Sequence, residues 1–301
     1  MKLAIMSDLH VDRNYLTEED LRQLIQVLKE ENVTALHLAG DTSNSPAQTC
    51  AIAAKFSNAG IETTFNFGNH ELGEIDDPKQ MEDYPDPHFL NLKGRSLSES
   101  TTLVGFNGWY DYGFLPGSTT AENEKRKELY LYDRAILRGG KDPMIMDQLL
   151  ARLKPLLDEL SKKKQTVLFA THFVPRPEFI LWRSGGSKRW NLLNAFLGSP
   201  RLGELLAHYP NITDVTFGHT HHRFPPTKIG SITYHCRPFG YTMEWRLTYR
   251  FLIENQLLKP EEFRPRTIKT AVRENREAFD RFKTQHLAEE YRESLSLFSV
   301  E

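Results

Sequence analysis

The first 41 residues, "MKLAIMSDLHVDRNYLTEEDLRQLIQVLKEENVTALHLAGD" (1–41), decide the fold class. Residues 2–6 and 33–40 are short apolar runs, which are typical of buried strands. Residues 17–32 between them predict a helix, because Thr17 and Asp20 can form a capping box and apolar residues recur at helical spacing. A strand, a helix and a second strand in succession indicate a layered α/β protein.

The same alternation continues along the chain. Further strands are predicted at 61–68, 101–106, 165–172, 212–219, 231–236 and 244–254, and further helices at 46–60, 144–160 and 202–209. We expect one domain over residues 1–255, with the polar segment 110–142 as an insertion and residues 256–301 as a C-terminal helical extension. The intermittent apolar face of that extension favours a helix packed on the domain surface over a cap or a dimerisation helix.

The composition excludes several classes of protein. The chain has 301 residues and a formal net charge of −2, so no general positive field favours nucleic acid or an anionic membrane as a partner. Its two cysteines do not form a disulfide framework or a zinc spacing. No apolar run approaches the roughly 20 residues of a membrane helix, and we expect a cytoplasmic protein. The sequence leaves the oligomeric state open.

Oxygen and imidazole side chains follow five of the predicted strands, each directly after the apolar run. They are Asp8 and His10, Asp41, Asn69 and His70, His172, and His219 and His221. Ligands of layered α/β proteins bind at the carboxyl ends of the strands, so we expect these residues to converge on one rim. Each short motif alone is more often a turn or a polar strand end, so the prediction of a functional site depends on their joint occurrence.

This donor set is typical of divalent metal ions. Carboxylate, amide and imidazole donors without thiolate suit Mn, Fe, Zn, Co or Ni better than a structural zinc site. Seven ligands exceed the needs of one ion and suit two ions that share a carboxylate. Because side chains alternate along an extended chain, Asp8 and His10 are expected to reach the same ion.

The order of the motifs resembles the calcineurin-like metallophosphoesterase superfamily over residues 1 to about 250. The motifs stand as "DLH" (8–10), "GD" (40–41), "GNHE" (68–71), His172 in "ATHF" (170–173) and "GHTH" (218–221). The resemblance implies a four-layer αββα sandwich and two divalent ions, with Mn or Fe favoured. It places the first ion on Asp8, His10, Asp41 and His221. It places the second on Asp41, Asn69, His172 and His219.

The resemblance also implies a reaction. A hydroxide that bridges the two ions would attack phosphorus, and His70 would contact the phosphate together with Asn69 and protonate the leaving oxygen. We therefore expect a phosphodiesterase that acts on a nucleotide or another small phosphoester. A phosphomonoesterase of the same superfamily is the alternative, and a catalytically silent scaffold is a weaker one. The stretch "GDTSNSP" (40–46) lacks the second Asp and the Arg of the protein Ser/Thr phosphatases.

Some neighbouring residues have two interpretations. Trp109 and Tyr110 follow a strand end and are candidate substrate contacts, although such aromatic residues more often pack a loop. Glu71 is expected either to orient His70 or a metal ligand, or to lie exposed in a turn. His222 adjoins the last motif without a counterpart in it, and we assign it no ligand role.

Overall fold

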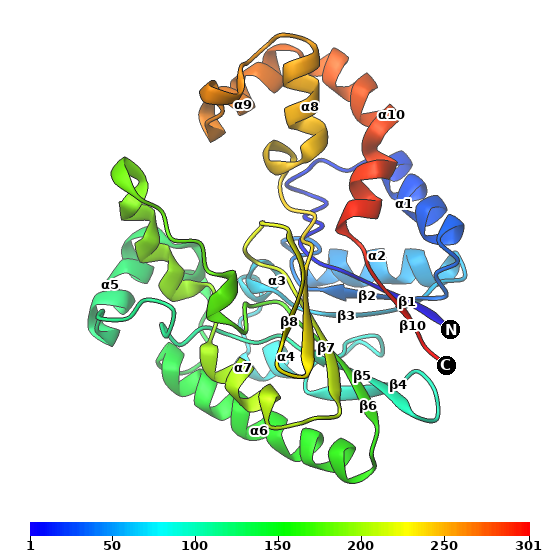
Figure 1. Cartoon of the computed structure of the whole chain (residues 1–301), viewed down its shortest axis with the longest axis vertical. Coiled ribbons are helices and arrows are strands. Elements are labelled where there is room, and N and C mark those ends of the chain that lie inside the picture. Colours follow the sequence, from blue (N-terminus) through cyan, green and yellow to red (C-terminus); the bar gives the residue numbers. More distant parts are fainter.

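Two β-sheets pack face to face at the centre of the computed structural model, which describes residues 1–301 (Figure 1). The first sheet has the order β10-β1-β2-β3, and its members are β1 (Lys2–Met6), β2 (Ala35–Ala39), β3 (Glu62–Asn66) and β10 (Ser296–Ser299). The second has the order β4-β5-β6-β7-β9-β8, and its members are β4 (Lys93–Ser96), β5 (Thr101–Phe106), β6 (Thr166–Thr171), β7 (Ile212–Phe217), β8 (Phe224–Ile229) and β9 (Ile232–Cys236). Strands β1–β3 run parallel, as do β5, β6, β7 and β9, so their carboxyl ends share one rim.

Alternation along the strands produces the layers. Leu3 and Ile5 of β1 belong to a small apolar cluster between the sheets, with residues of β2, β5 and β6. Ala4 and Met6 point to the opposite face, where they join the large core formed with the helices. A strand that is buried on both faces in this way reads as a continuous apolar run, as "KLAIM" does.

Helices cover the outer face of each sheet. The first sheet is covered by α1 (Glu18–Glu30) and α2 (Pro46–Asn58), and the second by α6 (Asp142–Lys162) and α7 (Pro200–Ala207). The capping box of Thr17 and Asp20 is present at the start of α1. The predicted four-layer αββα sandwich is therefore confirmed.

The prediction of a strand at 244–254 is wrong, because this segment forms helix α8 (Arg246–Glu254). Its aromatic and β-branched residues favour a strand by local propensity, but Leu247, Phe251 and Leu252 lie buried on one helical face. That face packs against the C-terminal helices, of which α9 spans Pro265–Glu274 and α10 spans Arg276–Ser294. Packing of the apolar face has overridden the local preference.

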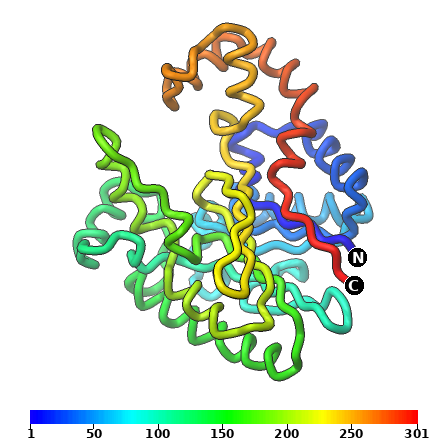
Figure 2. The backbone as a smooth tube through the Cα atoms, viewed as in Figure 1, coloured from blue at the N-terminus to red at the C-terminus, as the bar shows by residue number.

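The chain returns to the sandwich after α10. Strand β10 pairs antiparallel with β1, so the two termini lie side by side (Figure 2). The C-terminal helices therefore form a lobe that is anchored at both ends above the first sheet. None of the helices combines the length and apolar composition that crossing a membrane requires.

Segment 110–142 contains helix α5 (Thr120–Tyr130) and a short 3-10 helix at Tyr132–Ala135. Two further short helices follow β3, namely α3 (Asn69–Leu72) and α4 (Pro78–Glu82). Helix α3 begins directly at the rim, so the sequence "GNHE" lies on its first turn.

Candidate metal centre

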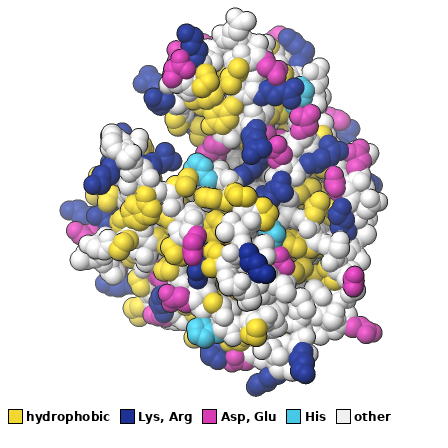
Figure 3. Space-filling view, in the orientation of Figure 1, with side chains coloured by type: hydrophobic (Ala, Val, Ile, Leu, Met, Phe, Trp, Pro, Cys, Tyr) yellow, Lys and Arg dark blue, Asp and Glu magenta, His cyan; other side chains and the backbone are white.

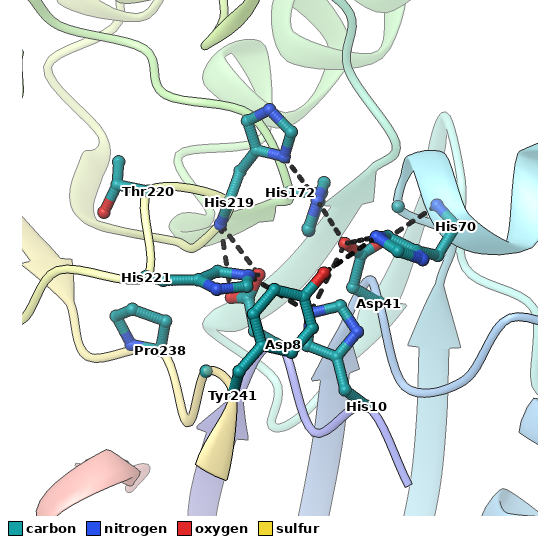
Figure 4. A network of polar contacts seen from close by, with 12 residues as sticks. Asp8, His10, Asp41, His70, His172, His219, Thr220, His221, Pro238 and Tyr241 are labelled. Carbon is teal, nitrogen blue, oxygen red and sulfur yellow. Dashed lines mark hydrogen bonds and ion pairs between the residues drawn. The ribbon is translucent and has the colours of Figure 1, made fainter. Parts of the chain in front are cut away.

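The side chains predicted as metal ligands meet at the rim in two adjoining groups (Figure 4). The donor atoms of Asp8, His10, Asp41 and His221 lie within 4.8 Å of one another, and the same holds for Asp41, His172 and His219. Asn69 adjoins the second group, because its Oδ1 lies 3.3 Å from His172 Nε2. The exposed His222 belongs to neither group.

Asp41 stands between the two groups. Its Oδ2 lies 3.7 Å from His10 Nε2 and 3.4 Å from His172 Nε2. Its Oδ1 accepts a hydrogen bond of 3.0 Å from the backbone N–H of His70, which fixes the orientation of the carboxylate. This geometry is suited to a carboxylate that serves two cations.

The imidazole rings are oriented as metal ligands. In the first group His10 Nε2 faces His221 Nε2 at 3.1 Å, and in the second His172 Nε2 faces His219 Nδ1 at 3.1 Å. Three of these rings have an oxygen acceptor at the other nitrogen: Glu244 Oε2 for His221, Ala39 O for His172 and Phe196 O for His219. An outer N–H bonded to oxygen leaves the inner nitrogen with its lone pair toward the centre. Lone pairs and carboxylates that converge in this way fit divalent cations.

The charges at the site favour cations. Burial opposes protonation of His221, but hydrogen bonds to Asp8 and Glu244 outweigh it and raise its pKa to about 10. Burial is likewise outweighed at His172, whose pKa is raised to about 9 by the charge of Asp41. Burial dominates at His10 and lowers its pKa to about 3. The carboxylates thus stabilise positive charge in a buried site.

Five of the ligand residues have a left-handed backbone. The φ angles are 58° for Asp8, 45° for His10, 53° for Asp41, 66° for His219 and 53° for His221. Residues with a Cβ rarely adopt this region, and such conformations gather at functional sites. The expected grouping of Asp8 with His10 is present, but the reason given for it is wrong, since turns rather than an extended chain direct both side chains inward.

Two motif glycines allow the ligands to approach closely. A Cβ on Gly68 would overlap Asp41 Oδ1, and a Cβ on Gly218 would overlap Asp8 Oδ2. The glycines of "GNH" and "GHTH" are thus required by the carboxylates that lie against them.

Glu71 supports the loops that carry the ligands. Its buried carboxylate accepts five hydrogen bonds, from the backbone N–H groups of Asp41, Thr42, Ser43 and Gly68 and from the hydroxyl of Thr49. Burial, followed by the charge of Asp41, raises the pKa of Glu71 to about 7, and the backbone donors oppose this rise. Glu71 therefore orients the backbone of the bridging residue, whereas the structure gives it no bond to the His70 ring.

His70 lies beside the two groups. Its Nδ1 is 2.7 Å from Asn44 Oδ1, and its Nε2 is 3.3 Å from the hydroxyl of Tyr241 and 3.8 Å from Asp41 Oδ2. The ring of Tyr132 stacks on His70 with centroids 5.4 Å apart. With Nδ1–H donated to Asn44, Nε2 is the nitrogen that is available to a substrate.

The sequence did not identify four residues that support the ligands or His70, namely Tyr132, Asp133, Tyr241 and Glu244. Asp133 accepts a 2.9 Å hydrogen bond from Asn69 Nδ2, which turns Asn69 Oδ1 toward His172. Asp133 lies next to Tyr132 in the segment that was predicted to be an insertion, and no motif marks either residue. Tyr241 and Glu244 follow β9, and applying the strand-end rule to residues 231–236 would have pointed to them.

The predicted substrate contact of Trp109 and Tyr110 is not supported. The side chains are 1% and 0% exposed and stack on each other in the core. The indole Nε1 donates a 2.7 Å hydrogen bond to Asp142, and Arg138 lies over the ring. Neither aromatic face is available to a ligand.

Solved structures align with this chain at low sequence identity. The phosphopantetheinyl hydrolase of Mycobacterium tuberculosis aligns with a TM-score of 0.62 and 19% identity, over 81% of this chain and 91% of that one. A dimetal phosphatase from Danio rerio aligns with a TM-score of 0.46 and 14% identity, over 79% of this chain and 87% of that one. No curated protein sequence matches the chain.

The family itself is established by sequence. The family model described as calcineurin-like phosphoesterase matches residues 1–223, which is more than half of the chain and includes all five motifs. These motifs are the segments whose side chains form the two donor groups around Asp41. The chain therefore belongs to the calcineurin-like phosphoesterase family.

Proposed function

We propose that the protein is a dinuclear-metal-dependent phosphodiesterase that acts on a nucleotide or another small phosphoester. The observation that carries this proposal is the pair of donor groups that share Asp41, with Nε2 of His70 beside them. His70 also lines a cavity of about 730 Å³, which has room for an organic group next to the metal centre.

The residues present fit two ions, held by Asp8, His10, Asp41 and His221 on one side and by Asp41, Asn69, His172 and His219 on the other. Divalent ions bound there would polarise the phosphoryl oxygens and lower the pKa of water.

The remaining steps belong to side chains of the chain. His70 Nε2 is placed to donate a proton to the leaving oxygen, and Asn44 keeps the ring in the orientation that this requires. The hydroxyl of Tyr241 lies within reach of the same nitrogen and can hydrogen-bond the leaving oxygen or the phosphate. Asn69, oriented by Asp133, presents its oxygen to the second group and lies next to His70 on the same helical turn.

A hydrolysis panel with Mn tests the proposal. It compares phosphomonoesters, aryl phosphodiesters, 2′,3′- and 3′,5′-cyclic nucleotides, single-stranded DNA and a phosphopantetheinyl diester. The last is included because of the name of the structure at TM-score 0.62. We expect diesters to be hydrolysed faster than monoesters, and the reverse order would favour the phosphomonoesterase alternative.

The variant His70→Ala separates chemistry from metal binding. We expect a fall in kcat of about 100-fold or more, in line with the loss of a general acid, with both ions retained. Loss of an ion in this variant would show that His70 is a ligand. Absence of activity in the wild type, with less than one ion per chain after metal supplementation, would favour the scaffold alternative.

A further inference from the structure

The cavity beside His70 extends beyond the site that the family motifs build. Its inner end is lined by His70, Tyr132 and Tyr241, and its far wall by residues of α9 and α10. The family match ends at residue 223, so that far wall, within residues 265–294, lies outside it. The wall is therefore the place where this chain can select a substrate of its own.

The cavity is lined by positive charge that the protein neutralises only in part. Five cations and one acidic residue line it, namely Arg13, Lys269, Arg273, Arg276, Lys283 and Asp280. Two of the cations are occupied, because Arg276 pairs with Asp280 at 2.8 Å and Lys283 pairs with Asp20 at 2.8 Å. Arg13, Lys269 and Arg273 have no carboxylate partner within ion-pair distance. Lys and Arg side chains are numerous on the lobe that carries α8 and α9, which a notch sets apart in Figure 3.

Aromatic and apolar groups form the rest of the lining. The side chains of Tyr15 and Tyr132 are 72% and 43% exposed, so both rings are accessible to a ligand. Ile268, Val272 and Phe279 form the apolar part of the far wall. A cavity with exposed rings, apolar side chains and unpaired cations suits an organic anion with a flat or apolar body.

One of the unpaired cations, Arg13, lies next to the reactive end. Arg13 Nε lies 3.4 Å from Asn44 Oδ1, the atom that also holds His70 Nδ1. A group bound at Arg13 therefore lies close to the histidine that faces the leaving oxygen. The volume of about 730 Å³ greatly exceeds the needs of one phosphate and matches the size of pockets for drug-sized ligands.

We propose that this cavity binds the leaving group of the substrate, and that this group is a nucleoside-sized organic body with its own phosphate, held by Arg13, Lys269 and Arg273. The inference rests on the proposed phosphodiesterase function and deepens it. The preferred substrates are then diesters in which a second phosphate lies on the leaving-group side. The oxygen of water bonds to phosphorus, the P–O bond to the leaving group breaks, and the products are a phosphomonoester of the other half and an alcohol that carries the second phosphate.

Binding of two nucleotides to the full-length, Mn-loaded protein tests the proposal by calorimetry. In adenosine 3′,5′-bisphosphate one phosphate stands for the scissile phosphate at the ions, and the second stands for the leaving group's own phosphate in the cavity. Adenosine 5′-monophosphate lacks the second. We expect the bisphosphate to bind at least about tenfold more tightly than the monophosphate, a difference of about 1.4 kcal/mol. Equal affinities would overturn the proposal.

Variants locate the effect on the far wall. Lys269→Ala combined with Arg273→Ala is expected to bring the ratio of the two affinities close to one, since both side chains are exposed on α9 and their removal leaves the core intact. Arg266→Ala is the matched control, because Arg266 lies on the same helix but does not line the cavity, and it should keep the ratio. A double variant that keeps the wild-type ratio would overturn the assignment.

Hydrolysis of bis(p-nitrophenyl) phosphate, whose leaving group has no second phosphate, tests the proposed function separately. A protein that hydrolyses this ester but shows no preference for the bisphosphate would overturn the cavity proposal alone. A protein that prefers the bisphosphate but hydrolyses no ester would overturn the phosphodiesterase function and with it the leaving-group role of the cavity.

Discussion

Glu71 offers the sharpest test of how the site is built. Glu71→Gln keeps the shape of the side chain but leaves one acceptor oxygen in place of two. In the wild type, Oε1 of Glu71 accepts three hydrogen bonds, and Oε2 accepts bonds of 3.0 Å from Asp41 N and 2.9 Å from Gly68 N. In the better orientation the amide oxygen keeps the three partners, and the new NH₂ group faces the other two donors.

The loss of stability follows from the two backbone N–H groups that no longer have an acceptor. A buried donor without an acceptor costs about 1–3 kcal/mol, so the substitution should lower the free energy of unfolding by about 2–6 kcal/mol. The whole stability of a domain is commonly about 5–15 kcal/mol, so this is a large fraction of it. Because the stranded donors belong to Asp41 and to the residue before Asn69, metal affinity should fall as well.

Urea denaturation of the metal-free protein measures the first effect, and calorimetric titration with Mn measures the second. Glu74→Gln is the matched control, because Glu74 lies one turn away and is exposed. We expect the control to behave as the wild type. A loss of stability below about 1 kcal/mol in Glu71→Gln would refute the view that this carboxylate holds the rim loops together.

Two further predictions concern single residues, Glu244 and His37. Glu244→Ala removes the acceptor at His221 Nδ1 and should weaken Mn binding about 10- to 100-fold in a calorimetric titration, and an unchanged affinity would contradict its role in orienting the ring. Burial lowers the pKa of His37 to about 4 from 6.5, so its contribution to stability is complete above pH 6.5 and is lost as the pH falls toward 4. The loss amounts to about 3 kcal/mol at 1.36 kcal/mol per pH unit, and the unfolding free energy of His37→Gln should lack this part of the pH dependence.

The sequence contains the ligands because parallel strands deliver their carboxyl ends to one edge. An apolar run followed by Asp or His identifies such an end without knowledge of the turn that follows. The turn itself was not predictable, because the backbone N–H groups of Asp8 and His10, which have left-handed φ angles, donate to Gly40 O and Asp41 O, and these partners are distant in sequence. The grouping was therefore right while its geometric reason was wrong.

Misreading one element hid part of the site. The predicted strand at 244–254 begins with Glu244, whereas in the structure Glu244 ends the 3-10 turn Thr242–Glu244 that precedes α8. Trp109 shows the opposite error, since position after a strand end does not decide whether a side chain points to solvent or inward. Its indole N–H is satisfied by Asp142, a residue 33 positions away, and that contact depends on tertiary structure.

Both donor groups combine residues from the two sheets, so the metal centre depends on how the sheets are aligned. Asp41 comes from the first sheet, and His172, His219 and His221 come from the second. Asn14 joins the sheets at the rim: its amide donates to Leu9 O and Gly240 O, and its Oδ1 accepts from the backbone and hydroxyl of Thr242.

The backbone adds to this connection, because Phe239 N donates to Ser7 O and Gly240 N donates to Asp8 O, both at 3.0 Å. The loop after β1, which carries Asp8, is thereby bonded to the loop after β9, which carries Tyr241. Since Asn14 and Tyr241 also line the cavity, the same bonds fix the metal ligands and the inner end of the proposed leaving-group cavity. A change in the alignment of the two loops would therefore displace the metal ligands and the inner end of the cavity together.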